Sequence, residues 1–270
     1  MTRKNQIVLL FCIATQSLLC AGYLLSKEVD LIQFLLTSWV GLSGTILIYG
    51  FDFGYGAGKK VVNYLRNSRQ HPWQSIFLVQ FIFVSLPLAF YFLSWNRILT
   101  IGLIGAIGFI YSLHFPFVKE GFRFKRLFIV KNIFIGFAWG ALILVGAGTL
   151  ENQLGNLLFW FMSLQIVVGS IVRDCADTEH DEKLGVKTLP LKFGIKRTIP
   201  SLHLANLSTG LVIVALPFQA TLFWVICLTV LWRTFVIWKV GHNQGAMFWT
   251  QTLNILTCLV FFFLLLIVSI

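Results

Sequence analysis

Charged side chains are scarce in this chain of 270 residues: they make up 11% of it, and only ten are acidic. Hydrophobic residues make up 57%, and the mean hydropathy is +0.83. Such a composition excludes a water-soluble globular domain and predicts a polytopic membrane protein. The net charge of +11 does not indicate a nucleic-acid-binding protein, because the basic residues stand in short clusters between apolar runs.

Motifs that mark several common sites are also absent. The five cysteines show no C-x-x-C spacing and four of them lie in apolar segments, so we expect free thiols and neither a disulfide framework nor a zinc site. The glycines between Gly50 and Gly58 belong to no G-x-x-x-x-G-K-[ST] sequence, which excludes a P-loop. No Ser/His/Asp grouping indicates hydrolysis, and the histidines lack the spacing of metal ligands.

Long apolar runs are the most abundant feature of the chain. A helix needs about 20 apolar residues to cross a bilayer, and these runs are too long for the strands of a membrane barrel. We therefore predict an all-α, polytopic membrane helical bundle that forms one domain over residues 1–270, with about nine transmembrane helices. The candidate spans are Ile7–Leu25, Leu31–Gly50, Ser75–Leu93, Ile98–Phe115, Phe128–Gly148, Leu154–Val172, Pro200–Leu216, Phe218–Trp238 and Phe248–Ile270.

Basic residues fall almost entirely on alternate connections between these runs. Lys27 and Arg97 lie on one side, Lys131 lies inside the fifth run, and the other Lys and Arg residues, Arg233 among them, fall on the opposite side. Basic residues mark the cytoplasmic side of a membrane protein. We therefore predict an integral, multi-pass protein of a bacterial-type cell membrane or its equivalent, with the N-terminus and the long, site-forming connections in the cytoplasm.

Acidic residues gather at the end of the sixth run. If this segment is helical, Asp174, Asp177 and Asp181 stand at i, i+3 and i+7, on one face, where they repel one another unless a cation lies between them. Mg²⁺ is typically held by one or two carboxylates together with phosphate oxygens of a substrate. The spacing therefore indicates a Mg²⁺-bridged phosphate or diphosphate site. The alternative is a solvated loop whose acids are paired by Lys183 and Lys187.

The same stretch closely resembles the second Asp-rich motif of the UbiA superfamily of intramembrane prenyltransferases. That motif reads D-x-x-D-x-x-x-D, followed by a basic residue, Gly and Thr-Leu-Pro. The matching residues are Asp174, Asp177, Asp181, Lys183, Gly185, Thr188, Leu189 and Pro190. The resemblance implies transfer of a polyprenyl group from an allylic prenyl diphosphate to an aromatic or other lipophilic acceptor, by a protein that is also in contact with membrane lipids. It also implies that Asp174, Asp177 and Asp181 are catalytic residues and ligands of Mg²⁺.

The connection after the second run corresponds to the first Asp-rich motif of the same superfamily, which is usually close to N-D-x-x-D-x-x-x-D. Only Asp52 of its acidic positions is present. The resemblance implies that Asp52 is a further catalytic residue and Mg²⁺ ligand opposite the second motif. One carboxylate in place of three leaves less negative charge for a second ion, and we expect Arg66 and Arg69 to contact diphosphate oxygens directly. The alternative is that these arginines only fix the topology.

Three further residues complete the diphosphate site that the resemblance implies. Lys131 lies near the start of the fifth run, where it either snorkels to the headgroups or faces the bundle interior and neutralises diphosphate. Tyr111 and Lys187 are the other expected diphosphate contacts. A few aromatic residues, with Tyr111 and Trp139 as candidates, are expected to line a tunnel for the isoprenoid tail.

Other functions compete with this interpretation. A UbiA-like protein that has lost catalysis and binds a lipid or assists assembly is consistent with the degenerate first motif, and a UbiA-type terpene cyclase would need no separate acceptor. A CDP-alcohol phosphotransferase is disfavoured, because its D-G-x-x-A-R element is absent. No motif identifies the acceptor, which could be a quinone-ring precursor, a tetrapyrrole, a carotenoid or another lipid, and none sets the length of the prenyl chain.

Overall fold

The computed structural model describes residues 3–26, 30–54, 79–112, 128–148, 153–183, 185–215, 220–242 and 247–269, and within these ranges it contains helices and no strand. The predicted all-α bundle is therefore confirmed. The elements in chain order are α1 (Arg3–Leu24), α2 (Leu31–Gly54), η2 (Phe81–Ser85), α5 (Leu86–Phe92), α6 (Trp95–Ser112), α7 (Val130–Ala147), α8 (Gln153–Ala176), α9 (Thr178–Lys183), α10 (Leu189–Phe193), α11 (Ile195–Thr209), η4 (Gly210–Ala215), α12 (Ala220–His242) and α13 (Met247–Ser269).

Each of the nine predicted runs overlaps a helical segment in the described ranges, and five helices are long and apolar enough to cross a membrane. Those five spans are Gln6–Leu24, Leu31–Tyr49, Val130–Ala147, Gln153–Ala176 and Thr221–His242. Two further apolar helical segments, Phe81–Phe92 and Thr252–Ile267, are shorter. These helices are those of an integral membrane protein, whereas nine crossings stay a prediction.

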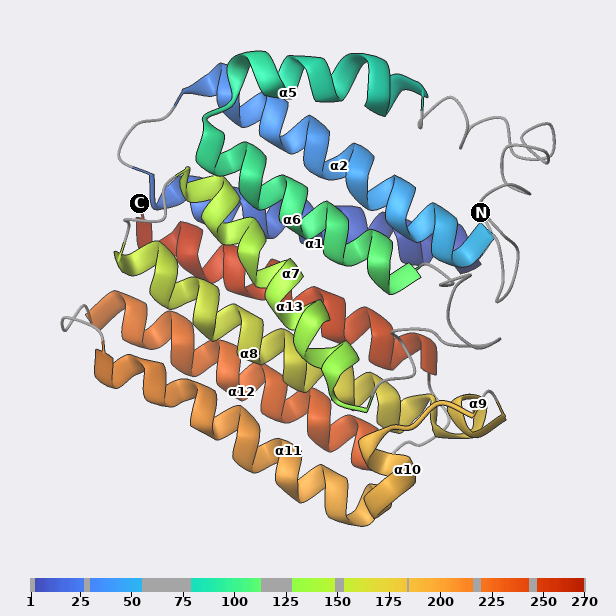
Figure 1. Cartoon of the computed structure of the whole chain (residues 1–270). Helices are drawn as coiled ribbons and strands as arrows, with labels where there is room; N and C mark the ends of the chain where they lie inside the picture. Colours follow the sequence, from blue (N-terminus) through green and yellow to red (C-terminus); the bar gives the residue numbers. More distant parts are fainter. Residues whose placement is uncertain are drawn as a thin grey trace.

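The long helices run side by side and the short helices α9 and α10 lie at one end of the bundle (Figure 1). The N-terminus lies at this same end, and the C-terminus lies at the opposite end. Helix α7 packs against α8, and α1 packs against both α7 and α13. The residues that follow α8 therefore lie at this end of the bundle, close to the start of α7.

Turns in the segment after α8 explain the Gly and Thr-Leu-Pro part of the predicted motif. Gly185 and Gly194 have φ of 64° and 79°, in the left-handed region that side chains disfavour. Thr188 precedes α10 in extended conformation, and Pro190 lies in its first turn, where no backbone N–H is needed. The chain thus turns back on itself, and α11 begins at Ile195 instead of at the predicted Pro200, which lies inside that helix.

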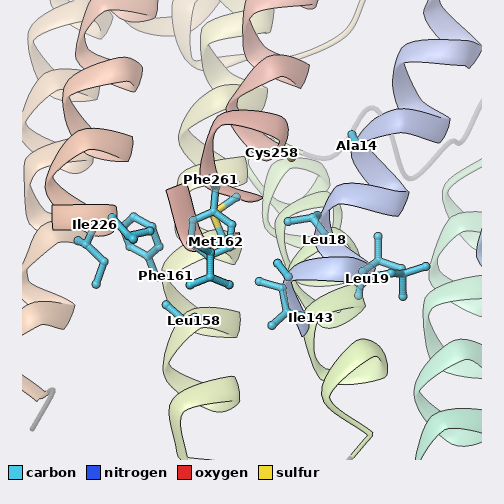
Figure 2. Close-up of a cluster of buried hydrophobic side chains, with 14 of the residues drawn as sticks. Ala14, Leu18, Leu19, Ile143, Leu158, Phe161, Met162, Ile226, Cys258 and Phe261 are labelled. Carbon is cyan, nitrogen blue, oxygen red and sulfur yellow. The ribbon is translucent and has the colours of Figure 1, made fainter. Parts of the chain in front are cut away.

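The hydrophobic core joins α1, α7, α8, α12 and α13 (Figure 2). Leu18, Ile143, Phe161, Ile226 and Phe261 are fully buried in it, one from each of these helices. Lipid tails are as apolar as these side chains, so close packing rather than water exclusion holds such helices together.

Small residues bring α1 and α7 into contact. A Cβ atom on Gly22 would overlap the carbonyl oxygen of Ile143, and one on Gly146 would overlap the carbonyl oxygen of Leu19. Such backbone-to-backbone approach is the typical role of small residues between membrane helices.

Arg97 links three helices at the opposite end of the bundle. Its buried guanidinium donates from Nε to the carbonyl oxygen of Val145 over 3.1 Å, and it also donates to the carbonyl oxygen of Gly146 and to the side chain of Gln33. The last carbonyls of α7, which have no partner inside their own helix, are satisfied in this way. Arg97 therefore ties the start of α6 to the end of α7 and to α2.

Candidate active site

A cavity of about 460 Å³ lies inside the bundle between α1, α2, α6, α7 and α8 and reaches α12 and α13. Its polar part is lined by Lys131, Arg173, Asp174, Asp177, His180 and Asp181. Elsewhere its wall is mostly apolar and includes Leu19, Val40, Ile101, Ile104, Leu142 and Val145. A space of this kind suits a long apolar molecule with one strongly charged end.

Asp174 is held at the C-terminal end of α8 by two residues at the start of α7. One carboxylate oxygen accepts a hydrogen bond from Lys131 Nζ at 2.7 Å, and the other accepts one from Asn132 Nδ2 at 3.0 Å. Asn132 Nδ2 also donates to Ser170 Oγ over 3.0 Å. Both members of the Lys131–Asp174 ion pair are buried. Of the two interpretations of Lys131, the structure therefore supports the one in which it faces the bundle interior.

Asp177 and Asp181 continue the same face beyond the end of α8. The helical course is almost uninterrupted, because the Asp177 N–H donates to the Arg173 carbonyl and the Asp181 N–H donates to the Asp177 carbonyl. Asp177 Oδ2 also accepts a hydrogen bond from Arg173 Nε at 3.3 Å. The three aspartates line one cavity, as the i, i+3 and i+7 spacing predicts.

Each of the two outer aspartates has one carboxylate oxygen that lacks a hydrogen-bond partner within the described part of the chain. Asp177 Oδ1 and Asp181 Oδ2 are buried and have no hydrogen-bond partner there. The pKa of Asp181 is raised to about 6, mainly by burial; the charges of Asp174 and Asp177 also raise this pKa, whereas Lys131 and Arg173 lower it. Bringing a cation among these carboxylates would remove the repulsion between them.

The described residues contain no set of three or more His, Cys, Asp or Glu side chains that could by itself hold a metal ion. The two unsatisfied oxygens of Asp177 and Asp181 nevertheless fit a hard cation that takes most of its other ligands from substrate phosphate and water. The donor chemistry of the site therefore suits Mg²⁺ bound together with a diphosphate.

Of the remaining predicted site residues, the structure describes only Lys187 with its side chain. Asp52 lies in the last turn of α2 and Tyr111 lies in the last turn of α6, but their side chains, like the whole of Arg66 and Arg69, fall outside the described structure. Lys187 is exposed between α9 and α10 and does not line the cavity.

An aromatic cluster also lies on the cavity wall. The rings of Phe11 and Tyr49 stack with centroids 3.9 Å apart, and Trp139 Nε1 donates a hydrogen bond to the Tyr49 hydroxyl at 3.2 Å. All three residues line the cavity, and that Trp139 contacts an isoprenoid tail there stays a prediction. Phe11 was not foreseen, since one Phe among 27 carries no sequence signal.

Two polar residues of the cavity also escaped the sequence analysis. The charge pattern predicts Arg233 on a cytoplasmic connection, which is wrong: its side chain is 1% exposed inside α12 and lines the cavity. Asn254 lies on the neighbouring helix α13 and lines the cavity as well. Arg233 therefore does not belong to the basic residues that mark the cytoplasmic side. A charge near the middle of an apolar run was the available signal for it.

A closed helical bundle whose cavity has acidic and basic groups at one end and an apolar wall defines an intramembrane enzyme or lipid-binding protein. The chain belongs to the UbiA prenyltransferase family, whose family model matches residues 68–267.

Among proteins of known activity, the chain is 31% identical over 96 residues to digeranylgeranylglyceryl phosphate synthase of Methanocaldococcus jannaschii. That segment covers 35% of this chain and 32% of the relative. A UbiA homologue from Archaeoglobus fulgidus, solved with GPP and Mg²⁺ bound, superposes with a TM-score of 0.70 and 17% identity, covering 99% of this chain and 98% of the homologue. A digeranylgeranylglyceryl phosphate synthase structure gives 0.64 and 18%, covering 99% of both chains. These structures share the fold of this protein.

Proposed function

We propose that the protein is a Mg²⁺-dependent intramembrane prenyltransferase that moves a polyprenyl group from an allylic prenyl diphosphate to a lipophilic acceptor. The observation that carries this proposal is that three aspartates and Lys131 line the polar part of one cavity whose wall beyond them is mostly apolar. The GPP and Mg²⁺ bound by the A. fulgidus homologue support the same assignment. The isoprenoid tail would lie along the apolar wall, with its diphosphate at Asp177 and Asp181.

The residues of the site have separate roles in this reaction. Asp177 and Asp181 would hold Mg²⁺, with Asp174 and Asp52 as further ligands, and the ion would neutralise the leaving diphosphate. Lys131, released from Asp174 when the ion binds, would donate to diphosphate oxygens. Arg66, Arg69 and Tyr111 stay proposed diphosphate contacts, whereas Lys187 lies outside the cavity and is given no role in the reaction.

The bond changes follow from these positions. The bond between the allylic C1 and its oxygen breaks, and diphosphate leaves with the electron pair. The carbocation that develops at C1 is stabilised by the nearby carboxylates and by the aromatic faces of Tyr49 and Trp139. An acceptor atom then forms a bond to C1 and loses a proton. The apolar wall keeps water away from the cation.

We further propose that this end of the bundle faces the cytoplasm. The N-terminus lies at the same end as α9 and α10, and the C-terminus lies at the other (Figure 1). This arrangement agrees with the distribution of Lys and Arg over the connections between the apolar runs.

A second candidate function is supported by the first motif, in which Asp52 is the only acidic residue. A site with fewer carboxylates could bind a prenyl lipid without ionising it, so that the protein would be a lipid-binding or assembly protein. A terpene cyclase would ionise the same substrate but would release diphosphate without an acceptor.

The proposal is tested with purified protein in nanodiscs, labelled geranyl and geranylgeranyl diphosphates, and a lipid extract of the native membrane as the source of acceptor. We expect Mg²⁺-dependent label in a lipid product, abolished by EDTA and lowered at least about tenfold by Asp177→Asn and by Asp181→Asn. Glu182→Gln is the matched control, because Glu182 lies on α9 but is exposed and outside the cavity.

Each alternative predicts a different result. Mg²⁺-dependent binding of the prenyl diphosphate without diphosphate release would support the lipid-binding protein. Release of diphosphate with a cyclic product and no need for extract would support the cyclase. Equal activity of the wild type and both Asp variants would refute the role given to these carboxylates.

A further inference from the structure

A second polar cluster lies in the wall of the same cavity, between α8, α12 and α13. Arg233 donates from Nε to Gln165 Oε1 at 3.3 Å and from Nη1 to Asn254 Oδ1. Asn254 Nδ2 in turn donates to the carbonyl oxygen of Gly169 at 3.0 Å. Arg233 and Asn254 both line the cavity, so this cluster is in contact with the space that would hold the substrates.

The guanidinium of Arg233 carries a charge that no acidic side chain of the described structure balances. It remains protonated at any physiological pH, and it has five N–H groups. Within the described residues only neutral amide oxygens accept from it, and the ion pairs there are Lys131–Asp174 and Arg173–Asp177. A buried charge without a counter-ion is costly, whereas a carboxylate or phosphate would accept two parallel hydrogen bonds from the guanidinium fork.

The cluster is also held rigidly in place. Gln165 Nε2 donates to Asn206 Oδ1 at 2.8 Å and to Thr209 Oγ1 at 2.7 Å, so its oxygen is directed to Arg233. A Cβ atom on Gly169 would lie 2.6 Å from Arg233 Nη1, so the absence of a side chain lets the guanidinium lie against α8. A fixed donor of this kind loses little entropy when an anion binds to it.

The position of the cluster separates it from the proposed metal site. Gly169 and Asp174 lie on the same helix, five residues apart, which corresponds to a rise of about 7.5 Å. The diphosphate would bind at the level of Asp174 or beyond it, toward Asp177 and Asp181. An anionic group bound to Arg233 would therefore lie deeper in the cavity than the diphosphate, by at least about 7.5 Å along α8, which leaves room for an acceptor molecule between them.

From this geometry we propose that Arg233 and Asn254 form the acceptor subsite, and that the acceptor carries a carboxylate or a phosphate group. This inference rests on the proposed prenyl transfer and names its acceptor class. The anion binds to the guanidinium and the Asn254 amide, which places the nucleophilic atom of the acceptor against the allylic C1.

Two variants test the subsite in different ways. Arg233→Met removes the charge and keeps an apolar side chain of similar length. Asn254→Asp leaves Arg233 in place but supplies an internal carboxylate next to Nη1, so it should block the anion without opening a cavity. The matched control is Arg97→Met, which removes another buried arginine, one that lies outside the cavity, and should lower thermal stability without changing the choice of acceptor.

The assay separates the lipid extract of the native membrane into anionic and uncharged fractions and supplies each with labelled geranylgeranyl diphosphate. Two matched pairs of acceptors accompany the fractions: 4-hydroxybenzoate with 4-hydroxybenzamide, and a glyceryl ether phosphate with its dephosphorylated alcohol. The pairs distinguish a carboxylate from a phosphate. We expect product from the anionic fraction only. Arg233→Met and Asn254→Asp should each raise the KM of the anionic acceptor at least about 30-fold, and leave the KM of the prenyl diphosphate within about twofold.

Other results would overturn the inference. Product from the uncharged fraction in the wild type, or an unchanged KM for the anionic acceptor in both variants, would show that no anion binds to Arg233. A parallel rise in the KM of the prenyl diphosphate would mean that Arg233 serves the diphosphate. If neither fraction yields product while diphosphate donors still bind with Mg²⁺, the proposed transfer itself fails and the acceptor subsite fails with it.

Discussion

Replacing Gly105 with leucine should shorten the prenyl chain that the protein accepts. Gly105 lies in the middle of α6 and lines the cavity, and a Cβ atom placed on it would meet no other atom within 4 Å. The new side chain would therefore enter the cavity instead of pressing on a neighbouring helix. Ile101 lies one turn further from the charged end, so the leucine would obstruct the passage toward it.

The size of the effect follows from the carbon atoms that the leucine displaces. One isoprene unit has five carbons, and burial stabilises each by about 0.8 kcal/mol, or about 4 kcal/mol for the unit. Because 1.4 kcal/mol corresponds to a factor of ten, loss of one buried unit weakens binding by up to about a thousandfold. A long donor that reaches past Gly105 should lose this energy, whereas a short donor should not.

The measurement compares kcat/KM for geranyl and geranylgeranyl diphosphates in the wild type, Gly105→Leu and Gly102→Leu. Gly102 is the control, because it lies on the same helix with equally open space around it, but it is exposed on the outside of the bundle and does not line the cavity. We expect a loss of at least about tenfold for geranylgeranyl diphosphate only, and only in Gly105→Leu. Equal losses for both donors, or no loss for either, would refute this assignment of the tail site.

Three further outcomes follow from the structure. Gly22→Ala should destabilise the bundle by about 1–3 kcal/mol, because its methyl group would overlap the backbone of α7, and a melting temperature in detergent equal to that of the wild type would contradict this. Lys131→Met should destabilise the metal-free protein, because it leaves Asp174 buried without its ion-pair partner, and Mg²⁺ should raise the melting temperature of this variant more than that of the wild type. Since the pKa of Asp181 is raised to about 6, a fall in pH through 6 should weaken Mg²⁺-dependent binding of prenyl diphosphate and should stabilise the metal-free protein. Asp181→Asn should remove both changes. Binding that does not change between pH 7.5 and 5.5 would refute this role of Asp181.

The helices and the acidic face could be predicted from the sequence because both depend on local patterns. Apolar runs long enough to cross a bilayer leave the backbone little choice but a helix, and the structure places a helical segment on each of them. The spacing of Asp174, Asp177 and Asp181 fixes their common face once the segment is helical. The structure adds the reason that the face points inward, since Lys131 and Asn132 hold Asp174 from the start of α7.

The second polar cluster could not be predicted in the same way, because its members are far apart in the sequence. Gln165, Arg233 and Asn254 come from α8, α12 and α13, and only the packing of these helices brings them together. Each residue alone is compatible with several roles, and Arg233 was interpreted as a topology signal. Contacts between distant segments decide which basic residues face the headgroups and which face the cavity, and no local pattern records them.

Lys131 and Arg233 each place a positive charge in the same cavity, and we propose that each binds a different anion. Lys131 is matched to Asp174, so in the absence of substrate its charge is already balanced, and it becomes available to diphosphate only when a cation takes over the carboxylate. Arg233 has no such partner in the described structure, so it attracts an anion whether or not the donor is bound. A carboxylate or phosphate on the acceptor therefore binds to Arg233 and does not compete with diphosphate for Mg²⁺. Keeping the two anions at least about 7.5 Å apart along α8 leaves room for the allylic carbon between them, in the cavity that the rings of Tyr49 and Trp139 also line.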